Sequence, residues 1–200
     1  MTVRSSFPDL LSDRLATYEP LRVEAAEGTT RAAVILLLRP SDDGAEALFV
    51  VRAEHPTDPW SGHVALPGGR MDPGDPDLVH TALRELREET GLRLKRPDIV
   101  GRLDELHPTS RHIPRIAITP FVGWQSRGGT VRRTVEIDGH FWAPLAELRA
   151  PSRRSSLVLE REGDSFRFPT IEYAGYTVWG LTYSIVRNFL DLIAVGDERQ

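Results

Sequence analysis

The sequence predicts a layered α+β fold. Segments typical of β-strands dominate the middle of the chain, one amphipathic helix is inserted among them, and another amphipathic helix closes the chain. The 200 residues fit one domain better than two, and this length is enough to bury a sizeable core. We therefore expect a lead-in over residues 1–30, with one short helix, followed by a single domain over residues 31–200.

Each expected element has its own local signal. Two apolar segments on either side of the turn Ser41–Gly44 predict a β-hairpin. The inserted helix ends at Gly91, because glycine readily adopts the left-handed conformation that closes helices. In chain order, we expect strands at 31–38, 47–52, 62–66, 99–106, 116–124, 135–142 and 166–173, and helices at 9–18, 77–90, 145–148 and 181–194.

The composition excludes several classes of protein. With no cysteine, the chain has no thiolate zinc site, disulfide framework or cysteine nucleophile. The longest apolar run, 32–38, is far shorter than the roughly 20 residues of a membrane-spanning helix. Pro8 and Asp9 interrupt the segment where a signal peptide would need apolar residues. We expect no membrane partner and a cytoplasmic location.

The charged residues are unusual in kind. The net charge of −4 argues against nucleic acid as a partner, and Lys95 is the one lysine among 25 basic residues. Two explanations of the arginine excess stay open: the base composition of the genome, or a role for guanidinium groups in gripping phosphates. Neither a Gly-X-Ser-X-Gly elbow nor a phosphate-binding P-loop sequence occurs.

Three acids are crowded on the inserted helix. At about 100° per residue, Glu85, Glu88 and Glu89 share an arc of about 100° that borders the apolar face. Like charges at this spacing repel by about 0.2–0.5 kcal/mol per pair, and partial burial increases the cost. Magnesium prefers oxygen ligands and would relieve the repulsion. A solvated acidic face is the alternative for such a stripe taken alone.

The neighbouring residues favour the metal site. Gly68 and Gly69 allow backbone amides to approach phosphate oxygens closely, where a side chain would interfere. Arg84 stands beside the first acid and could pair with a carboxylate and orient it. These residues together indicate a site for a divalent cation and a phosphate-bearing ligand.

Together they resemble the signature of the Nudix hydrolase family. That signature is Gly, five residues, Glu, seven residues, and then Arg-Glu-aliphatic-X-Glu-Glu-X-Gly-aliphatic. Residues 84–92 match its second half at every fixed position. In the first half, five residues separate Gly69 from the acid, but the acid is Asp75, and eight residues separate Asp75 from Arg84. Whether Asp75 replaces the usual glutamate is open at this point.

The first half of the signature, with Asp75 and its spacing, resembles the corresponding motif of the coenzyme A pyrophosphatase branch of the family. Pro-Gly-Gly-X-X-Asp-X-X-Asp, here from Pro67, and Thr-Ala-Leu-Arg-Glu, here from Thr81, recur in that branch at this spacing. Residues 48–52, 62–69 and 179–182 also resemble it, and the resemblance covers about residues 30–195. Between Arg52 and Gly62 the agreement weakens, because the basic residues usual in the branch are missing.

The resemblance implies the Nudix fold, an α/β/α sandwich around a mixed β-sheet, and a Mg²⁺ cofactor that Mn²⁺ could replace. The implied partner is a small nucleoside diphosphate derivative, with coenzyme A or its thioesters as the first candidate. Other nucleotides (a dNTP, ADP-ribose or a nucleotide sugar) and a nucleotide-binding regulator without catalysis are the alternatives. The branch often forms dimers, so a homodimer is among the expected partners.

The implied roles fall on few residues, and water would attack one phosphorus in line. The residue that takes the proton of this water is open, with Glu85, Glu105, Glu160 and Glu162 as candidates. The predicted metal ligands are Glu85, Glu88 and Glu89; the predicted catalytic residues are Glu85, Glu88 and Arg84; the predicted substrate-binding residues are Gly68, Gly69, Arg52, Arg111 and Arg115.

Overall fold

The structure is a computed structural model, and it describes residues 7–24, 26–42, 44–53, 62–108, 115–126, 128–132, 134–161 and 163–194. No helix in these ranges is long and apolar enough to cross a membrane. The elements are α1 (Phe7–Thr17), β1 (Thr30–Ser41), β2 (Gly44–Arg52), β3 (Val64–Ala65), β4 (Gly68–Arg70), α2 (Leu78–Thr90), η1 (Arg96–Asp98), β5 (Ile99–Arg102), β6 (Ile116–Trp124), β7 (Ile137–Pro144), α3 (Leu145–Arg149), η2 (Pro151–Arg153), β8 (Arg154–Arg161), β9 (Asp164–Tyr173), β10 (Tyr176–Val178) and α4 (Gly180–Ala194).

The central sheet is mixed. Among the described residues it has seven strands, in the order β3-β2-β1-β6-β5, with β4 paired to β1 and β7 paired to β2. β1 runs parallel to β6, from the pair Thr30 and Ile116 to the pair Leu38 and Trp124. The other pairings in this sheet are antiparallel. A second, antiparallel sheet has the order β10-β9-β8.

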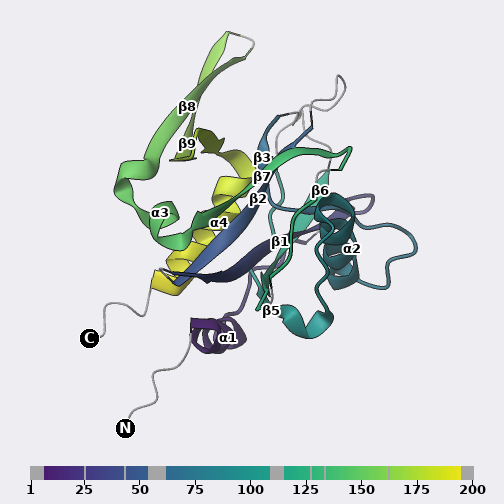
Figure 1. Ribbon diagram of the computed structural model, residues 1–200. Helices are drawn as coiled ribbons and strands as arrows, with labels where there is room; N and C mark the ends of the chain where they lie inside the picture. Colours follow the sequence, from purple (N-terminus) through teal and green to yellow (C-terminus); the bar gives the residue numbers. More distant parts are fainter. Residues whose placement is uncertain are drawn as a thin grey trace.

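Helices cover both faces of the central sheet, with α2 on one side and α4 on the other (Figure 1). Successive side chains of β1 alternate between the two sides, as they must in a strand. Ile35 and Leu37 are buried in the core on the α2 side, whereas Leu36 and Leu38 are buried in the core that includes α1 and α4. The predicted α/β/α sandwich around a mixed sheet is confirmed.

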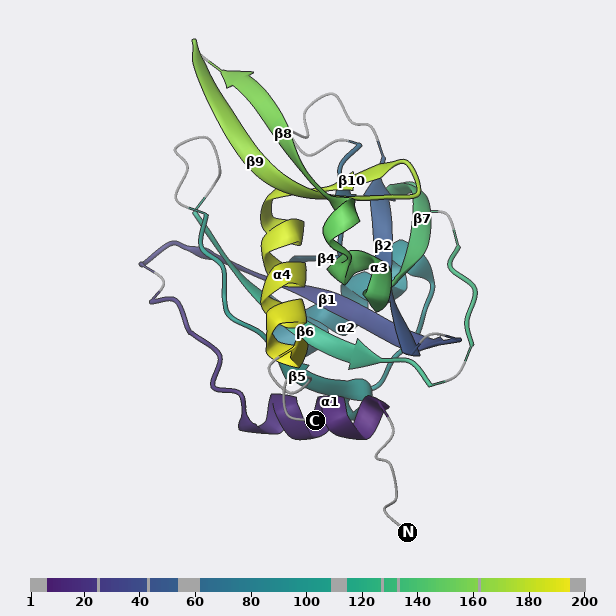
Figure 2. The ribbon, with the colours of Figure 1, turned by 90° about the vertical axis from the view of Figure 1, so that its left-hand side faces the viewer.

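The N-terminal lead-in is tied to the domain. Helix α1 lies beside β5 and the end of α4 (Figure 2). Just after α1, the Tyr18 hydroxyl donates to Asp104 at 2.7 Å, and Asn188 of α4 donates to the second oxygen of Asp104 at 3.1 Å. The backbone amide of Leu21 also donates to Asp104, at 2.8 Å. One carboxylate therefore joins the lead-in to the last helix.

Several strands differ from their expected bounds. β8 was not expected, because its side chains are mostly exposed and show no alternating burial; pairing with β9 holds it, and the two form an arm that extends from the body (Figure 2). β7 begins at Ile137 and not at Val135, which is 92% exposed. β5 ends at Arg102 and not at Leu106. β4 lies where no strand was expected, because Gly68–Arg70 pairs with β1.

Candidate metal and diphosphate site

Both ends of α2 are fixed by local contacts. The Asp77 carboxylate accepts a hydrogen bond from the backbone amide of His80 at 2.9 Å and so caps the first turn. Gly91 closes the helix with a left-handed φ of 74°, and its amide donates to the Arg87 carbonyl at 2.9 Å. The helix therefore ends directly after the three acids, whose positions are set by its last two turns.

The three acids of the stripe have different surroundings. Glu89 is buried, with 4% of its surface exposed, and Glu85 is half-buried. The Glu88 side chain is 45% exposed, and its carboxylate accepts a hydrogen bond from Arg84 at 3.0 Å. The predicted partial burial of the acidic stripe therefore holds for two of the acids, whereas the third faces solvent.

Two glycines of β4 bring the backbone against these acids. The Gly68 amide donates to the Glu89 carboxylate at 3.0 Å, and a Cβ at Gly68 would overlap the backbone of Ala33 and Val34 in β1. A Cβ at Gly69 would instead overlap the Glu85 carboxylate. Gly68 is thus required by the sheet, and Gly69 by the acid that lies over it.

Arg84 connects the start of α2 to the acids. Its Nε and Nη2 donate to the two oxygens of Asp75 at 3.1 and 2.9 Å, and its Nη1 donates to Glu85 at 2.8 Å. Asp75 also accepts hydrogen bonds from the Thr81 hydroxyl at 2.9 Å and the Asp72 amide at 3.0 Å. The Arg84 guanidinium holds the pKa of Asp75 well below its ordinary value, although burial opposes this. Asp75 therefore positions Arg84, and Arg84 orients Glu85.

Glu136, just before β7, completes a group of three carboxylates. One oxygen of each of Glu85, Glu89 and Glu136 can lie within 4.8 Å of the others. The Ala53 amide donates to the Glu136 carbonyl at 3.0 Å, and the Thr134 hydroxyl donates to the Glu89 carbonyl at 3.2 Å. We call Glu85, Glu89 and Glu136 the carboxylate group. Sequence reasoning missed Glu136, since an exposed acid before a strand gives no periodic signal.

The charges of this group are not balanced. Burial, followed by the charges of Glu85 and Glu136, raises the pKa of Glu89 to about 8, against a hydrogen bond from Gly68 and the charge of Arg52 that lower it. Burial also raises the pKa of Glu85. Clustered carboxylates, one of them buried, offer the oxygen ligands that a hard divalent cation prefers.

The other predicted residues lie at varying places. Arg52 ends β2, and its charge reaches Glu89. Arg115 is exposed just before β6, where its carbonyl accepts from Thr30. Glu160 is exposed on β8. Arg111 and Glu162 lie outside the described residues.

Glu105, a fourth candidate for the proton acceptor, is bound away from the carboxylate group. It accepts hydrogen bonds from Arg31 at 2.9 Å, the Thr119 hydroxyl at 2.9 Å and the Val23 amide at 3.0 Å. Burial acts to raise its pKa, but these hydrogen bonds and the charge of Arg31 outweigh burial and lower it. Glu105 thus has a full set of partners within the fold.

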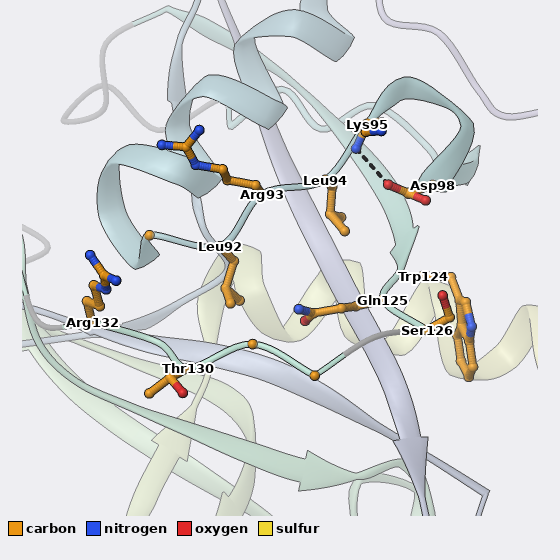
Figure 3. A pocket seen from close by; sticks show the side chains of 13 residues that line it. Leu92, Arg93, Leu94, Lys95, Asp98, Trp124, Gln125, Ser126, Thr130 and Arg132 are labelled. Carbon is orange, nitrogen blue, oxygen red and sulfur yellow. Dashed lines mark hydrogen bonds between the residues drawn. The ribbon is translucent and has the colours of Figure 1, made fainter.

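A hollow of about 670 Å³ lies beside the C-terminal end of α2. Leu92 and Gln125 point toward each other across it, whereas Arg93 and Arg132 lie at its rim (Figure 3). The Arg132 amide donates to the Thr90 carbonyl at 2.9 Å. The segment that leads to Glu136 is therefore attached to the end of α2, close to the acids.

Comparisons with known proteins show the family of the chain. The sequence profile of the NUDIX domain matches residues 28–160. The Nudix hydrolase NudL of Yersinia pestis is 33% identical over 168 residues, which cover 82% of this chain and 80% of that protein. A MutT/nudix family protein from Enterococcus faecalis superposes with a TM-score of 0.59 at 15% identity, over 90% of this chain and 67% of that chain.

A third relative was solved with a nucleotide derivative. The Nudix domain of Shewanella oneidensis NrtR, in complex with ADP-ribose, superposes with a TM-score of 0.50 at 26% identity, over 68% of this chain and 84% of that chain. Nudix enzymes generally use divalent metal ions. The chain therefore belongs to the Nudix hydrolase family, whose members act on pyrophosphate bonds of nucleotide derivatives.

Proposed function

We propose that the protein is a Mg²⁺-dependent pyrophosphohydrolase that cleaves the phosphoanhydride of a nucleoside diphosphate derivative. The observation that carries this proposal is a buried acid, Glu89, placed beside Glu85 and Glu136 with its pKa raised to about 8. Burying one acid beside two others destabilises a fold unless a cation neutralises them. A divalent ion and a diphosphate bound to it would supply that neutralisation.

The carboxylate group suits magnesium. Carboxylate oxygens are hard ligands, and Mg²⁺ is usually bound by one or two carboxylates together with waters and substrate phosphates. When bound, the ion would polarise a phosphoryl oxygen and lower the pKa of a bound water. We assign Glu85, Glu89 and Glu136 as its ligands, with Mn²⁺ as a substitute. Glu88 remains a predicted ligand that would have to leave Arg84 to join them.

The chain's own residues would bind and orient the diphosphate. Gly68 and Gly69 stay proposed substrate-binding residues through their backbone, since β1 fills the space beside Gly68 and the Glu85 carboxylate fills the space beside Gly69. Arg52 adds a positive charge near Glu89. Arg84, fixed by Asp75, keeps Glu85 in place. Glu85 is the one described candidate proton acceptor that belongs to the carboxylate group.

The reaction transfers a phosphoryl group to water. The water oxygen forms a bond to one phosphorus, and the bond from that phosphorus to the bridging oxygen breaks. The bridging oxygen leaves with the second phosphate, and Glu85 takes the proton of the water. The products are two phosphate monoesters.

Coenzyme A, or one of its thioesters, is the first candidate substrate. It is supported by the segments that resemble the coenzyme A branch, from Pro67 to Asp75 and from Thr81 to Glu85. The missing basic residues between Arg52 and Gly62 count against it. ADP-ribose is the second candidate, supported by the NrtR domain that was solved with this compound.

A substrate panel tests both candidates. The enzyme with Mg²⁺ is assayed on coenzyme A, ADP-ribose, dinucleoside polyphosphates and dNTPs, with the products identified by mass and Glu89→Gln as the control. We expect coenzyme A to give 4′-phosphopantetheine and 3′,5′-ADP with the highest kcat/KM. Faster turnover of ADP-ribose would transfer the assignment to the second candidate. No turnover of any compound with Mg²⁺ or Mn²⁺ would contradict the proposed function.

A further inference from the structure

A cavity of about 540 Å³ lies near the N-terminal end of α2, and arginine is the most frequent residue type in its lining. The arginines come from four separate segments: the lead-in, β1, η1 and β5. We call this cavity the arginine pocket and define it by Arg22, Arg31, Arg96 and Arg102. None of these residues belongs to the carboxylate group or to the contacts of Arg84.

The two acids that line the pocket are already engaged. Asp77 accepts hydrogen bonds from Arg96 at 2.9 and 3.0 Å and caps α2. Glu105 accepts from Arg31, Thr119 and Val23, as described above. Four guanidinium groups and two carboxylates give the lining a net charge of +2.

Part of this positive charge has no acceptor in the fold. The Arg31 Nε is buried and makes no hydrogen bond. Within the described parts of the chain, Arg22 and Arg102 form no ion pair at contact distance, although the charge of Arg102 helps to lower the pKa of Glu105. A buried N–H without an acceptor is costly, and an anion in the pocket would offset part of this cost through its charge. Guanidinium groups bind phosphate oxygens in pairs, so phosphate fits this lining better than a compact anion such as chloride.

Apart from Thr119, the remaining lining is apolar. Phe121 of β6 is 7% exposed, and Leu78 and Val79 of α2 and Met71 are half-buried. Ligand pockets commonly combine such apolar walls with a few polar groups that fix orientation. The occupant should therefore carry an organic body as well as an anionic group.

We propose that the arginine pocket binds the phosphate monoester of a small organic molecule. The pocket and the carboxylate group lie along the same segment: Met71 borders the pocket, and Gly69 borders the group. At roughly 3.3 Å per residue of extended chain, these two residues are roughly 7 Å apart. The phosphate monoester is therefore either a second part of the substrate or a separate compound bound beside it.

Binding to the metal-free protein tests the pocket without turnover. In EDTA, the carboxylate group repels anions, so titration calorimetry with AMP and with inorganic phosphate reports on other sites. We expect saturable binding of both probes, tighter for AMP because of the apolar wall. The double variant Arg22→Ala/Arg102→Ala should weaken both at least tenfold. Arg93→Ala, an exposed arginine at the other end of α2, is the matched control and should change them less than twofold.

The outcomes separate this inference from the proposed function. No saturable binding to the wild type, or equal affinity in the double variant at an unchanged melting temperature, would overturn the inference whatever the enzyme hydrolyses. A second arm assigns the source of the phosphate by measuring Mg²⁺-dependent hydrolysis with added AMP. Competitive inhibition, with a raised KM and unchanged kcat in the double variant, assigns the pocket to the substrate. Noncompetitive inhibition that the double variant abolishes assigns it to a separate ligand.

Discussion

Asp75 and Glu89 are both buried carboxylates next to α2, one before its first turn and one in its last, yet their pKa values move in opposite directions. Asp75 is paired with Arg84, which lowers its pKa. Glu89 is buried beside two other acids, and burial raises its pKa to about 8. Burial disfavours both charges, and the Arg84 guanidinium outweighs it at Asp75.

The difference separates a carboxylate that stabilises the fold, Asp75, from one proposed to bind a metal ion, Glu89. The cation for Asp75 is part of the chain, so this pair is complete when the protein folds. In the proposed metal site, the cation for Glu89 comes from solution, so this part of the site would be completed only on binding. The shared element is Arg84, which neutralises Asp75 and also holds Glu85 at the edge of the incomplete group.

Removing Arg84 should have the largest effect on stability. Arg84→Met leaves Asp75 buried without a counter-charge, and breaking a buried pair in this way costs about 3–5 kcal/mol. Urea denaturation of the wild type and the variant measures the loss. Asp75→Asn/Arg84→Met should recover part of it, because the double variant buries no unpaired charge. A loss below about 1 kcal/mol would mean that the pair does not support the start of α2.

Neutralising Glu89 should affect turnover and spare the fold. Glu89→Gln should lower kcat by roughly 10²- to 10³-fold, the scale for removing one electrostatic group from a preorganised site. Its stability without metal, near pH 8, should equal or exceed that of the wild type. Glu160→Gln, on the exposed arm, is the control and should leave kcat unchanged. Full activity of Glu89→Gln would refute its role.

The two glycines of β4 should separate fold from site. Gly68→Ala should destabilise the protein by about 1–3 kcal/mol, because the new Cβ meets the backbone of β1. Gly69→Ala should change stability less and lower kcat/KM more, because its Cβ displaces only the Glu85 carboxylate. Thermal melting and steady-state kinetics of both variants test this. Equal losses of stability would argue against different roles for the two positions.

What the sequence could predict follows from how local each signal is. Helix α2 is predictable from its apolar spacing and from Gly91, and Arg84 and Glu85 from the matched signature. Glu136 is not predictable, because no local sequence pattern marks it. A backbone hydrogen bond from Ala53, which is distant in sequence, holds it near Glu89. The unequal exposure of Glu88 and Glu89 also depends on tertiary packing. β8 is not predictable because most of its side chains are exposed and backbone pairing with β9 holds it in place.

A smaller effect is expected on the pH dependence of stability without metal. Glu89 has an ordinary pKa of 4.5 when unfolded and about 8 when folded, so the stability from its protonated form is complete below about 4.5 and is lost as pH rises through 8. Asp75 acts in the opposite sense, since its stabilisation is present above its ordinary pKa and is lost at lower pH. The melting temperature in EDTA should therefore fall from pH 5 to pH 8. In Glu89→Gln, the melting temperature should depend less on pH. If the variant kept the pH dependence of the wild type, that dependence would come from other titratable groups.

Proton release on metal binding tests most directly whether Glu89 is protonated in the metal-free protein and loses its proton when a cation binds. Mg²⁺ is titrated into metal-free protein near pH 7 in buffers of different ionisation enthalpy, and the dependence of the heat on the buffer gives the protons released. With the pKa of Glu89 near 8, binding should release about one proton from Glu89 at pH 7 and progressively fewer above pH 8, and Glu89→Gln should lose this contribution. Mg²⁺ binding with no proton release, or with the same release in the variant, would contradict the account.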